Sequence, residues 1–310
     1  MEPGGLPWQM AGAGMMGDYY GLPTQTISNA HLQLEYLAEA GPRIVRLTLA
    51  GSDVNLLAEV PGLHWATPYG EYYPRGGHRL CHAPEAFPRS YVPDNDGLTV
   101  TSVPGGVCLQ QPVEAQTGIR KSLEIHLQHD RPAVTLRHCL ENHGQWPVQL
   151  SAWAITQMRM GGVAILPQRL EPQADRELLP DRHLVLWPYT RWQDERLWLH
   201  DDYVFIQAQA QMPACKVGLL SHCGWVGYLL DDTLFVKRFD PEPNQSHPDR
   251  SCNVEVYCDD QFIELETLGP LCQLEPDQSI THIETWELYT GLGVAQTPEA
   301  VREMVKSLRL

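Results

Sequence analysis

Apolar and polar residues alternate with a period of two along most of this chain. Strands with one buried face show this pattern, and here they are rich in Val, Ile, Thr and aromatic residues. Because no long helical pattern separates them, we predict an all-β fold of antiparallel sheets packed face to face. The predicted strands are 31–37, 43–49, 97–103, 121–127, 133–140, 148–156, 203–209, 225–230, 233–239, 253–257, 262–268 and 279–288.

One helix is expected, at the C-terminus. Thr297 is a suitable N-cap and Pro298 suits the first helical position. The residues that would share one face of this helix are apolar, so it should lie against a sheet. They are Val301, Met304, Val305 and Leu308.

The 310 residues suggest one large domain. We assign a β-sandwich domain to residues 22–292, a flexible tail to 1–21 and the amphipathic helix to 293–310. Residues 167–202 form a long irregular segment rich in Pro, Arg, Asp and Trp. A loop of that length in a compact domain is usually functional.

Charge and composition exclude several classes of protein. The net charge of −16 disfavours nucleic acid or an anionic membrane as a partner. The eight cysteines have neither CxxC nor zinc-finger spacing, so we interpret them as free thiols of a cytoplasmic protein. The P-loop, G-x-S-x-G, G-x-G-x-x-G and H-E-x-x-H motifs are missing, and we expect no metal and no cofactor.

The stretch RGGHRLCHAPE (75–85) concentrates ionisable groups behind two glycines. Gly76 and Gly77 permit a positive φ or a close approach of the backbone to a ligand. His78 is a candidate proton donor and Arg79 a candidate anchor for hydroxyl or carboxylate oxygens. The alternative is a Gly-rich turn between strands, with a structural ion pair between Arg79 and Glu85.

The stretch FIELETLGP contains two candidate general bases. Period two places Phe262, Glu264, Glu266 and Leu268 on one face of a strand, with the carboxyl groups about 7 Å apart. Two carboxylates in one pocket raise the pKa of one of them, which suits a general base. The alternative is a solvated acidic face, which the apolar neighbours Phe262 and Leu268 disfavour.

A third polar group follows in DRSCNVEVYC. Asn253, Glu255 and Tyr257 share a face, and Lys237 and Arg238 end an earlier strand. These residues either line a polar pocket or form cross-strand ion pairs. We favour the pocket for Lys237 and Glu255 and the ion pair for Arg238.

Tryptophan is abundant, with nine residues in the chain. The C–H face of a sugar ring packs on indole, although most tryptophans belong to cores. Trp153, Trp187 and Tyr189 are the aromatic residues we expect at a cleft.

The order of RGGHRLCHAPE, RHCLENHGQWPVQLSAWAIT, LFVKRF, CNVEVY and FIELETLGPL resembles a bacterial branch of galactose-mutarotase-like (aldose 1-epimerase-like) proteins. The resemblance extends from about Ser28 to Leu288. It implies a β-supersandwich with a sugar-binding cleft on one sheet. It also implies that a strand glutamate removes the proton of the anomeric hydroxyl while a histidine protonates the ring oxygen.

Carried over residue by residue, the resemblance makes Glu264 or Glu266 the base, with Glu255 as a third choice. Arg75-Gly76-Gly77 resembles the Arg-Gly-Gly of the epimerases and would present His78 and Arg79 to a sugar. The sequence departs from the pattern at the histidine acid, where Trp153 and Thr156 stand instead.

Three hypotheses follow. The first is an epimerase-like enzyme for a sugar or sugar acid, with a uronate lyase or isomerase as a variant. Glu266 or Glu264 would be its base and His78 its acid, while Arg79, His82, Trp153, Lys237, Asn253 and Glu255 would bind substrate.

The second hypothesis is a carbohydrate-binding protein without catalysis. The third, which Pro84 disfavours, is a metal-dependent hydrolase using His78, His82 and Glu85. The expected partner is a small carbohydrate, and the sequence leaves the oligomeric state open.

Overall fold

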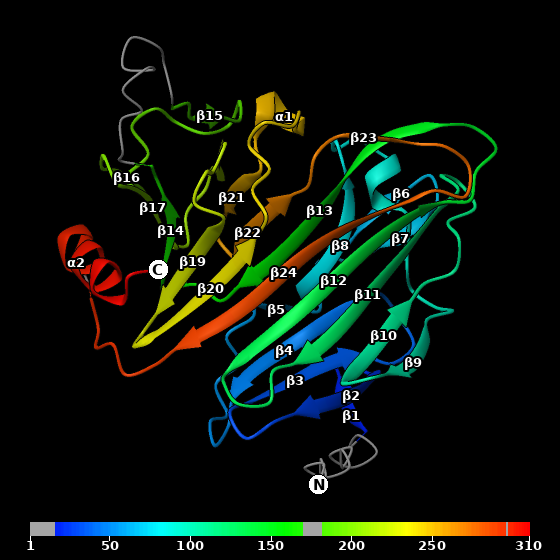
Figure 1. The fold of residues 1–310 in the computed structure, drawn as a ribbon, viewed down its shortest axis with the longest axis horizontal. Helices are drawn as coiled ribbons and strands as arrows, with labels where there is room; N and C mark the ends of the chain where they lie inside the picture. Colours follow the sequence, from blue (N-terminus) through cyan, green and yellow to red (C-terminus); the bar gives the residue numbers. More distant parts are fainter. Residues whose placement is uncertain (1–15, 170–181, 296) are drawn as a thin grey trace, which may run out of the picture.

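A computed structural model describes residues 16–169, 182–295 and 297–310, and Figure 1 shows their arrangement. Two large antiparallel sheets face each other, with a helix at one edge of the fold. The expected all-β class is confirmed.

The first sheet has twelve strands. Its order is β1 (Gly17–Tyr19), β2 (Leu22–Ser28), β3 (Leu32–Leu37), β4 (Arg43–Leu49), β8 (Arg75–Ala83), β13 (Val148–Met158), β22 (Ile263–Leu268), β21 (Val254–Cys258), β18 (Cys215–Leu219) and β15 (Val185–Leu186). In addition, β5 (Glu59–Val60) pairs with β8, and β23 (Cys272–Leu274) pairs with β13.

The second sheet has ten strands. Its order is β16 (Leu197–Leu199), β17 (Tyr203–Gln207), β14 (Val163–Pro167), β19 (Trp225–Leu230), β20 (Thr233–Phe239), β24 (Ser279–Tyr289), β12 (Ala133–Asn142), β11 (Ile119–Leu127), β10 (Gly106–Gln110) and β9 (Thr99–Val103). A small hairpin consists of β6 (Trp65–Thr67) and β7 (Gly70–Tyr72), and the short helices are η1 (Arg89–Tyr91) and α1 (Pro248–Ser251).

The main core lies between the two sheets. Alternate residues of the first sheet, such as Leu34 and Leu265, are fully buried against residues of the second, such as Leu136 and Phe235. Because side chains alternate along a strand, the other face of the first sheet points away from this core. That outer face carries the candidate site.

The glycine pair determines how β8 enters the first sheet. Gly76 and Gly77 have φ values of 83° and 62°. A Cβ would lie 2.1 Å from the Ala58 carbonyl oxygen at Gly76, and 1.9 Å from the Ile44 carbonyl oxygen at Gly77. Only glycine fits, and the stretch predicted as a ligand-presenting loop is a central strand.

The C-terminal helix agrees with the prediction. α2 (Pro298–Leu308) begins after Thr297, whose Oγ1 accepts a hydrogen bond from the Ala300 N–H at 3.3 Å. Val301 and Val305 are buried against a second core on the outer face of the ten-stranded sheet. Figure 1 shows α2 (red) at the edge of the fold near β14 and β17.

The predicted domain boundary at residue 22 lies too far along the chain, because residues 17–19 form β1 and pair with β2. Residues 1–15 lie outside the described residues, as does one part of the predicted irregular segment, 170–181. All eight cysteines are free. In the described part of the chain, no helix has the length and apolar character needed to cross a membrane.

Candidate functional site

A cavity of about 300 Å³ lies on the outer face of the twelve-stranded sheet. Its floor comes from the central strands, and its walls come from β6, η1 and the segment that follows β15. The residues that line it are Leu63, Trp65, Pro74, Arg79, Cys81, Glu85, Tyr91, Trp153, Ile155, Gln157, Tyr189, Lys216, Tyr257, Asp259, Phe262 and Glu264.

Strand register places the polar residues of the floor in one row. Gln157 lies opposite Glu264, Glu264 opposite Tyr257, and Tyr257 opposite Lys216. Directly opposed residues of neighbouring antiparallel strands have Cβ atoms about 5 Å apart on the same face. The row therefore runs across β13, β22, β21 and β18 without a break.

Glu264 is the carboxyl group at the centre of this floor. Its Oε1 accepts hydrogen bonds from Arg79 Nη2 and Gln157 Nε2, each at 3.0 Å. Burial raises the pKa of Glu264 to about 7, although the Arg79 guanidinium lowers it and Glu266 raises it further. A carboxylate with a near-neutral pKa is suited to accept and release a proton.

Glu266 lies on the same face of β22 but beneath the cavity lining. It accepts hydrogen bonds from the Trp153 indole N–H at 2.6 Å and from Lys216 Nζ at 2.9 Å. Its side chain is fully buried. Trp153 and Lys216 themselves line the cavity, so Glu266 supports the lining and Glu264 forms part of it.

Glu255 completes the cluster around Lys216. Lys216 Nζ lies 2.8 Å from Glu255 Oε2, and Glu255 lies directly opposite Glu266 in the sheet. Burial lowers the pKa of Lys216, but Glu255 and Glu266 outweigh it and hold that pKa well above its usual range. Burial raises the pKa of Glu255 well above its usual range, although the Lys216 ammonium lowers it.

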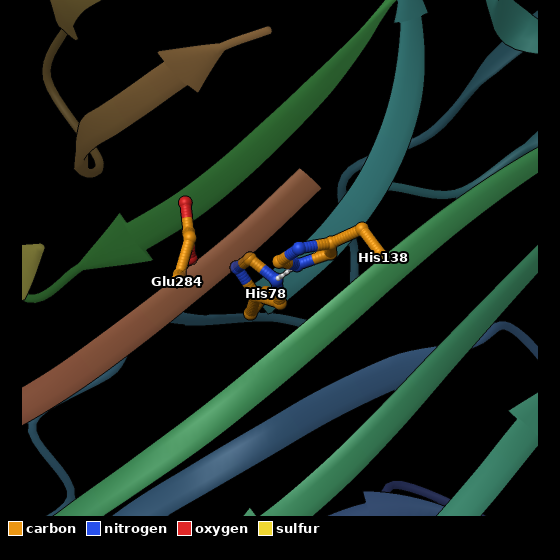
Figure 2. Close-up of side chains that lie close together, drawn as sticks. All are labelled: His78, His138 and Glu284. Carbon is orange, nitrogen blue, oxygen red and sulfur yellow. Dashed lines mark hydrogen bonds between the residues drawn. The ribbon is translucent and has the colours of Figure 1, made fainter. Parts of the chain in front are cut away.

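The expectation that His78 faces the same cleft as Arg79 is wrong. Neighbouring residues of β8 point to opposite faces, and His78 is buried between the sheets. Its Nε2 lies 2.7 Å from His138 Nε2 (Figure 2). Its Nδ1 lies 2.8 Å from Thr156 Oγ1. The histidine and Thr156 therefore meet in the core and not in the cavity.

These ring nitrogens form a directional chain. A carbonyl oxygen only accepts, so the His138 Nδ1–H donates to the His282 carbonyl, 2.9 Å away. Burial lowers the pKa of both His78 and His138, so both rings are neutral. His138 Nε2 then accepts from the His78 Nε2–H, and His78 Nδ1 accepts from the Thr156 hydroxyl.

One ligand atom each from His78, His138 and Glu284 lies within 4.8 Å of the others, which is a spacing that a metal ion accepts (Figure 2). However, Lys237 Nζ lies 2.9 Å from Glu284 Oε1. This ammonium group already balances the carboxylate, and a divalent cation would add unbalanced charge to a buried site. The cluster fits a hydrogen-bonded core network better than a metal centre.

Three further residues predicted to bind substrate lie away from the cavity. Lys237 donates to the backbone carbonyls of Ala154 and Leu265 inside the core, at 3.2 and 3.0 Å. His82 is buried, with its Nε2 3.7 Å from a Glu114 oxygen. The Asn253 amide ties neighbouring loops together, because it donates to the Ser221 and Pro241 carbonyls at 3.0 and 2.7 Å.

The predicted aromatic residues do gather at the site. Trp153 and Tyr189 line the cavity, whereas Trp187 is not among its lining residues. Lys216 Nζ lies 5.1 Å from the centre of the Trp153 ring and 4.7 Å from that of Trp187. The sequence analysis missed Lys216 and Gln157. The signal for Lys216 was available, because a single lysine interrupts the apolar run Cys215–Leu219.

No protein-family model matches the sequence. No curated protein matches it either. Solved structures do match. A galactose mutarotase-like protein from Lactobacillus casei ATCC 334 is 11% identical, with a TM-score of 0.57 over 86% of this chain and 100% of that one. A TPR-domain containing protein from Parabacteroides distasonis ATCC 8503 is 13% identical, with a TM-score of 0.58 over 89% of this chain.

This chain spans 50% of the length of the Parabacteroides protein. A provisionally named aldose 1-epimerase from Escherichia coli K12 is 14% identical, with a TM-score of 0.51 over 87% of this chain and 100% of that one. Similarity at this level of identity concerns the arrangement of the strands. The chain therefore has the galactose-mutarotase-like fold.

Proposed function

We propose that this protein binds a sugar in the cavity over β8, β13, β22, β21 and β18 and catalyses the interconversion of its anomers, with Glu264 as the general base. The observation that carries the proposal is the carboxyl group of Glu264 in the cavity lining, with a pKa of about 7. The neighbours with this fold support the choice of a sugar. One of these neighbours is a galactose mutarotase-like protein.

The lining suits a pyranose ring. Trp65 and Tyr91 stand in one part of the wall, with ring centres 5.3 Å apart, and Tyr189 and Tyr257 stand in another, 6.3 Å apart. Aromatic faces pack against sugar C–H groups, while Arg79, Gln157 and Glu264 offer hydrogen bonds to hydroxyls. A mixture of aromatic surface and a few fixed polar groups is typical of small-molecule sites.

In the proposed reaction, the Glu264 carboxylate takes the proton of the anomeric hydroxyl. The bond between the anomeric carbon and the ring oxygen breaks, and the ring oxygen takes a proton from the protein. Rotation about the bond between the aldehyde carbon and its neighbouring carbon then presents the other face of the aldehyde. Closure of the ring reverses both proton transfers and gives the other anomer. Each cycle returns both protons to their original groups.

The proton for the ring oxygen comes from a group in the lining that is protonated at neutral pH. Burial raises the pKa of Tyr189 and of Tyr257, so both phenols keep their protons. The Lys216 ammonium is also protonated. The cavity lining, as far as the structure describes it, contains no histidine. In this proposal one of the two phenols or the ammonium group donates the proton that a histidine would otherwise supply.

The absence of a histidine from the described cavity lining favours a second candidate function. A cavity with aromatic and hydrogen-bonding residues but no histidine acid also suits a protein that binds a carbohydrate and releases it unchanged. Turnover separates the two candidates, because only the first accelerates anomer exchange.

The test is proton NMR of the anomeric signals of freshly dissolved α-glucose, α-galactose and a uronic acid. We expect the wild type to accelerate exchange and Glu264→Gln to lose at least about a hundredfold of that acceleration, as general-base catalysis requires. Glu275→Gln, which changes an exposed carboxylate, is the matched control. If the wild type broadens the ligand signals but does not accelerate exchange, the protein binds the sugar without catalysis, and the second candidate function holds.

A further inference from the structure

The floor of the cavity contains buried polar atoms that other side chains leave free. Arg79 uses Nη2 for Glu264, and among the described residues its Nε and Nη1 have no hydrogen-bond partner. Gln157 uses Nε2 for Glu264, and its Oε1 likewise has no partner within the described chain. Both side chains are more than nine-tenths buried and both line the cavity.

Glu264 determines the orientation of the Gln157 amide. The carboxylate Oε1 accepts, so the amide must present its NH₂ group to it, at 3.0 Å. The amide oxygen is therefore the atom left for a ligand. The same carboxylate oxygen takes one Arg79 N–H, which leaves the other guanidinium donors for a ligand.

The free atoms form a mixed set of two donors from Arg79 and one acceptor from Gln157. A hydroxyl group matches this set, because it accepts from Arg79 and donates to the Gln157 oxygen. A carboxylate matches only half of it, because it accepts from Arg79 but brings a lone pair against the amide oxygen. It would also bring a second negative charge close to Glu264.

We propose that Gln157 is a specificity-determining residue of this site: with Arg79 it selects a ligand hydroxyl over a ligand carboxylate at the floor of the cavity. This inference rests on the proposed function in one respect, that the ligand is a sugar. It excludes the sugar acids that Arg79 alone would accept, and it gives Gln157 a role in contact with the ligand.

Methyl glycosides test this inference apart from catalysis, because a glycosidic methyl group prevents ring opening. The probes are methyl galactopyranoside and methyl glucopyranoside and their uronate counterparts, titrated by NMR. For the wild type we expect the neutral glycoside to bind at least about tenfold more tightly than its uronate, as expected for one satisfied buried polar group.

Gln157→Met keeps the length of the side chain and removes the amide. We expect it to weaken binding of the neutral glycoside about tenfold and to leave uronate binding unchanged, so that the preference disappears. Gln149→Met is the matched control, since Gln149 is exposed on the same strand, β13. The wild-type ratio requires no variant and decides the matter even if Gln157→Met fails to fold.

A wild type that binds the uronate as tightly as the neutral glycoside would overturn the inference, and so would a Gln157→Met variant that weakens both ligands equally. Both results leave sugar binding intact. Failure of every glycoside to bind would overturn the inference together with the sugar site. Anomer exchange of free sugars, measured separately, shows whether the catalytic proposal fails on its own.

Discussion

Lys237 Nζ lies 2.9 Å from Glu284 Oε1, and both side chains are fully buried between the two sheets. Although burial alone would raise the pKa of Glu284, the Lys237 ammonium outweighs it and holds that pKa well below the usual range. Trp286 Nε1 donates to the other carboxylate oxygen at 2.9 Å. The pair joins β20 to β24 in the core, and neither residue lines the cavity.

Lys237→Met should lower the free energy of unfolding by about 3–5 kcal/mol, because it leaves the Glu284 charge buried without a counterion. The measurement is urea denaturation. The double variant Lys237→Met/Glu284→Gln removes both charges and should recover much of the loss. A single variant as stable as the wild type would contradict the assignment of a charged buried pair.

The pH profile of anomer exchange should report Glu264. Since only the ionised form accepts a proton, kcat/KM should rise with pH through a midpoint of about 7. Arg79→Met removes a cation that favours the ionised form, so the midpoint should move to higher pH. Arg238→Met, on the second sheet, should leave it in place. An unchanged midpoint in Arg79→Met would assign the titration to another group.

Acid should weaken the fold through its buried histidines. Burial lowers the pKa of His282 from 6.5 to about 3. Between these values the unfolded chain binds a proton that the folded chain does not, so stability falls as the pH falls. His282 alone contributes a slope of up to about 1.4 kcal/mol per pH unit. Denaturation of wild type and His282→Gln from pH 7 to pH 4 should show a shallower slope in the variant.

The C-terminal helix should contribute stability without affecting the site. Val301 is fully buried where α2 packs on the outer face of the ten-stranded sheet. Val301→Ala should lower the free energy of unfolding by about 2 kcal/mol, because it removes two buried methyl-sized groups. Glu303→Ala, on the exposed side of the helix, is the control. Anomer exchange should be unchanged in both.

All twelve strands predicted from period-two alternation are present, because alternation reports burial of one face directly. The same reasoning found that Glu264 and Glu266 share a face of their strand, as do Glu255 and Tyr257 of theirs. The strand register places all four on the same side of the sheet. It missed the other twelve strands of the described residues, among them β8 and β18. In β8 the glycines mimic a turn signal, and in β18 the run is short and nearly all of it is buried.

A site residue can be assigned to one face of a sheet only if its segment has been recognised as a strand. Where the segment is taken for a loop, the sequence does not show which way each side chain points. Taking Arg75–Ala83 as a loop left His78 and Arg79 free to point the same way. As a strand it sends them to opposite faces. The predictions that Lys237 and Asn253 bind substrate were wrong for another reason. Both are polar residues in strand patterns, and only the fold shows that their partners are Glu284 and the Ser221 and Pro241 carbonyls.

The close contacts at Gly76 and Gly77 limit how this protein can change over evolutionary time. Any side chain at either position would meet a backbone oxygen of a neighbouring segment, which cannot rotate away. Relatives that keep this sheet must therefore keep both glycines, even when the residues that contact a ligand have diverged. A chain without the pair has to lead β8, or the segments that contain Ala58 and Ile44, along another backbone path.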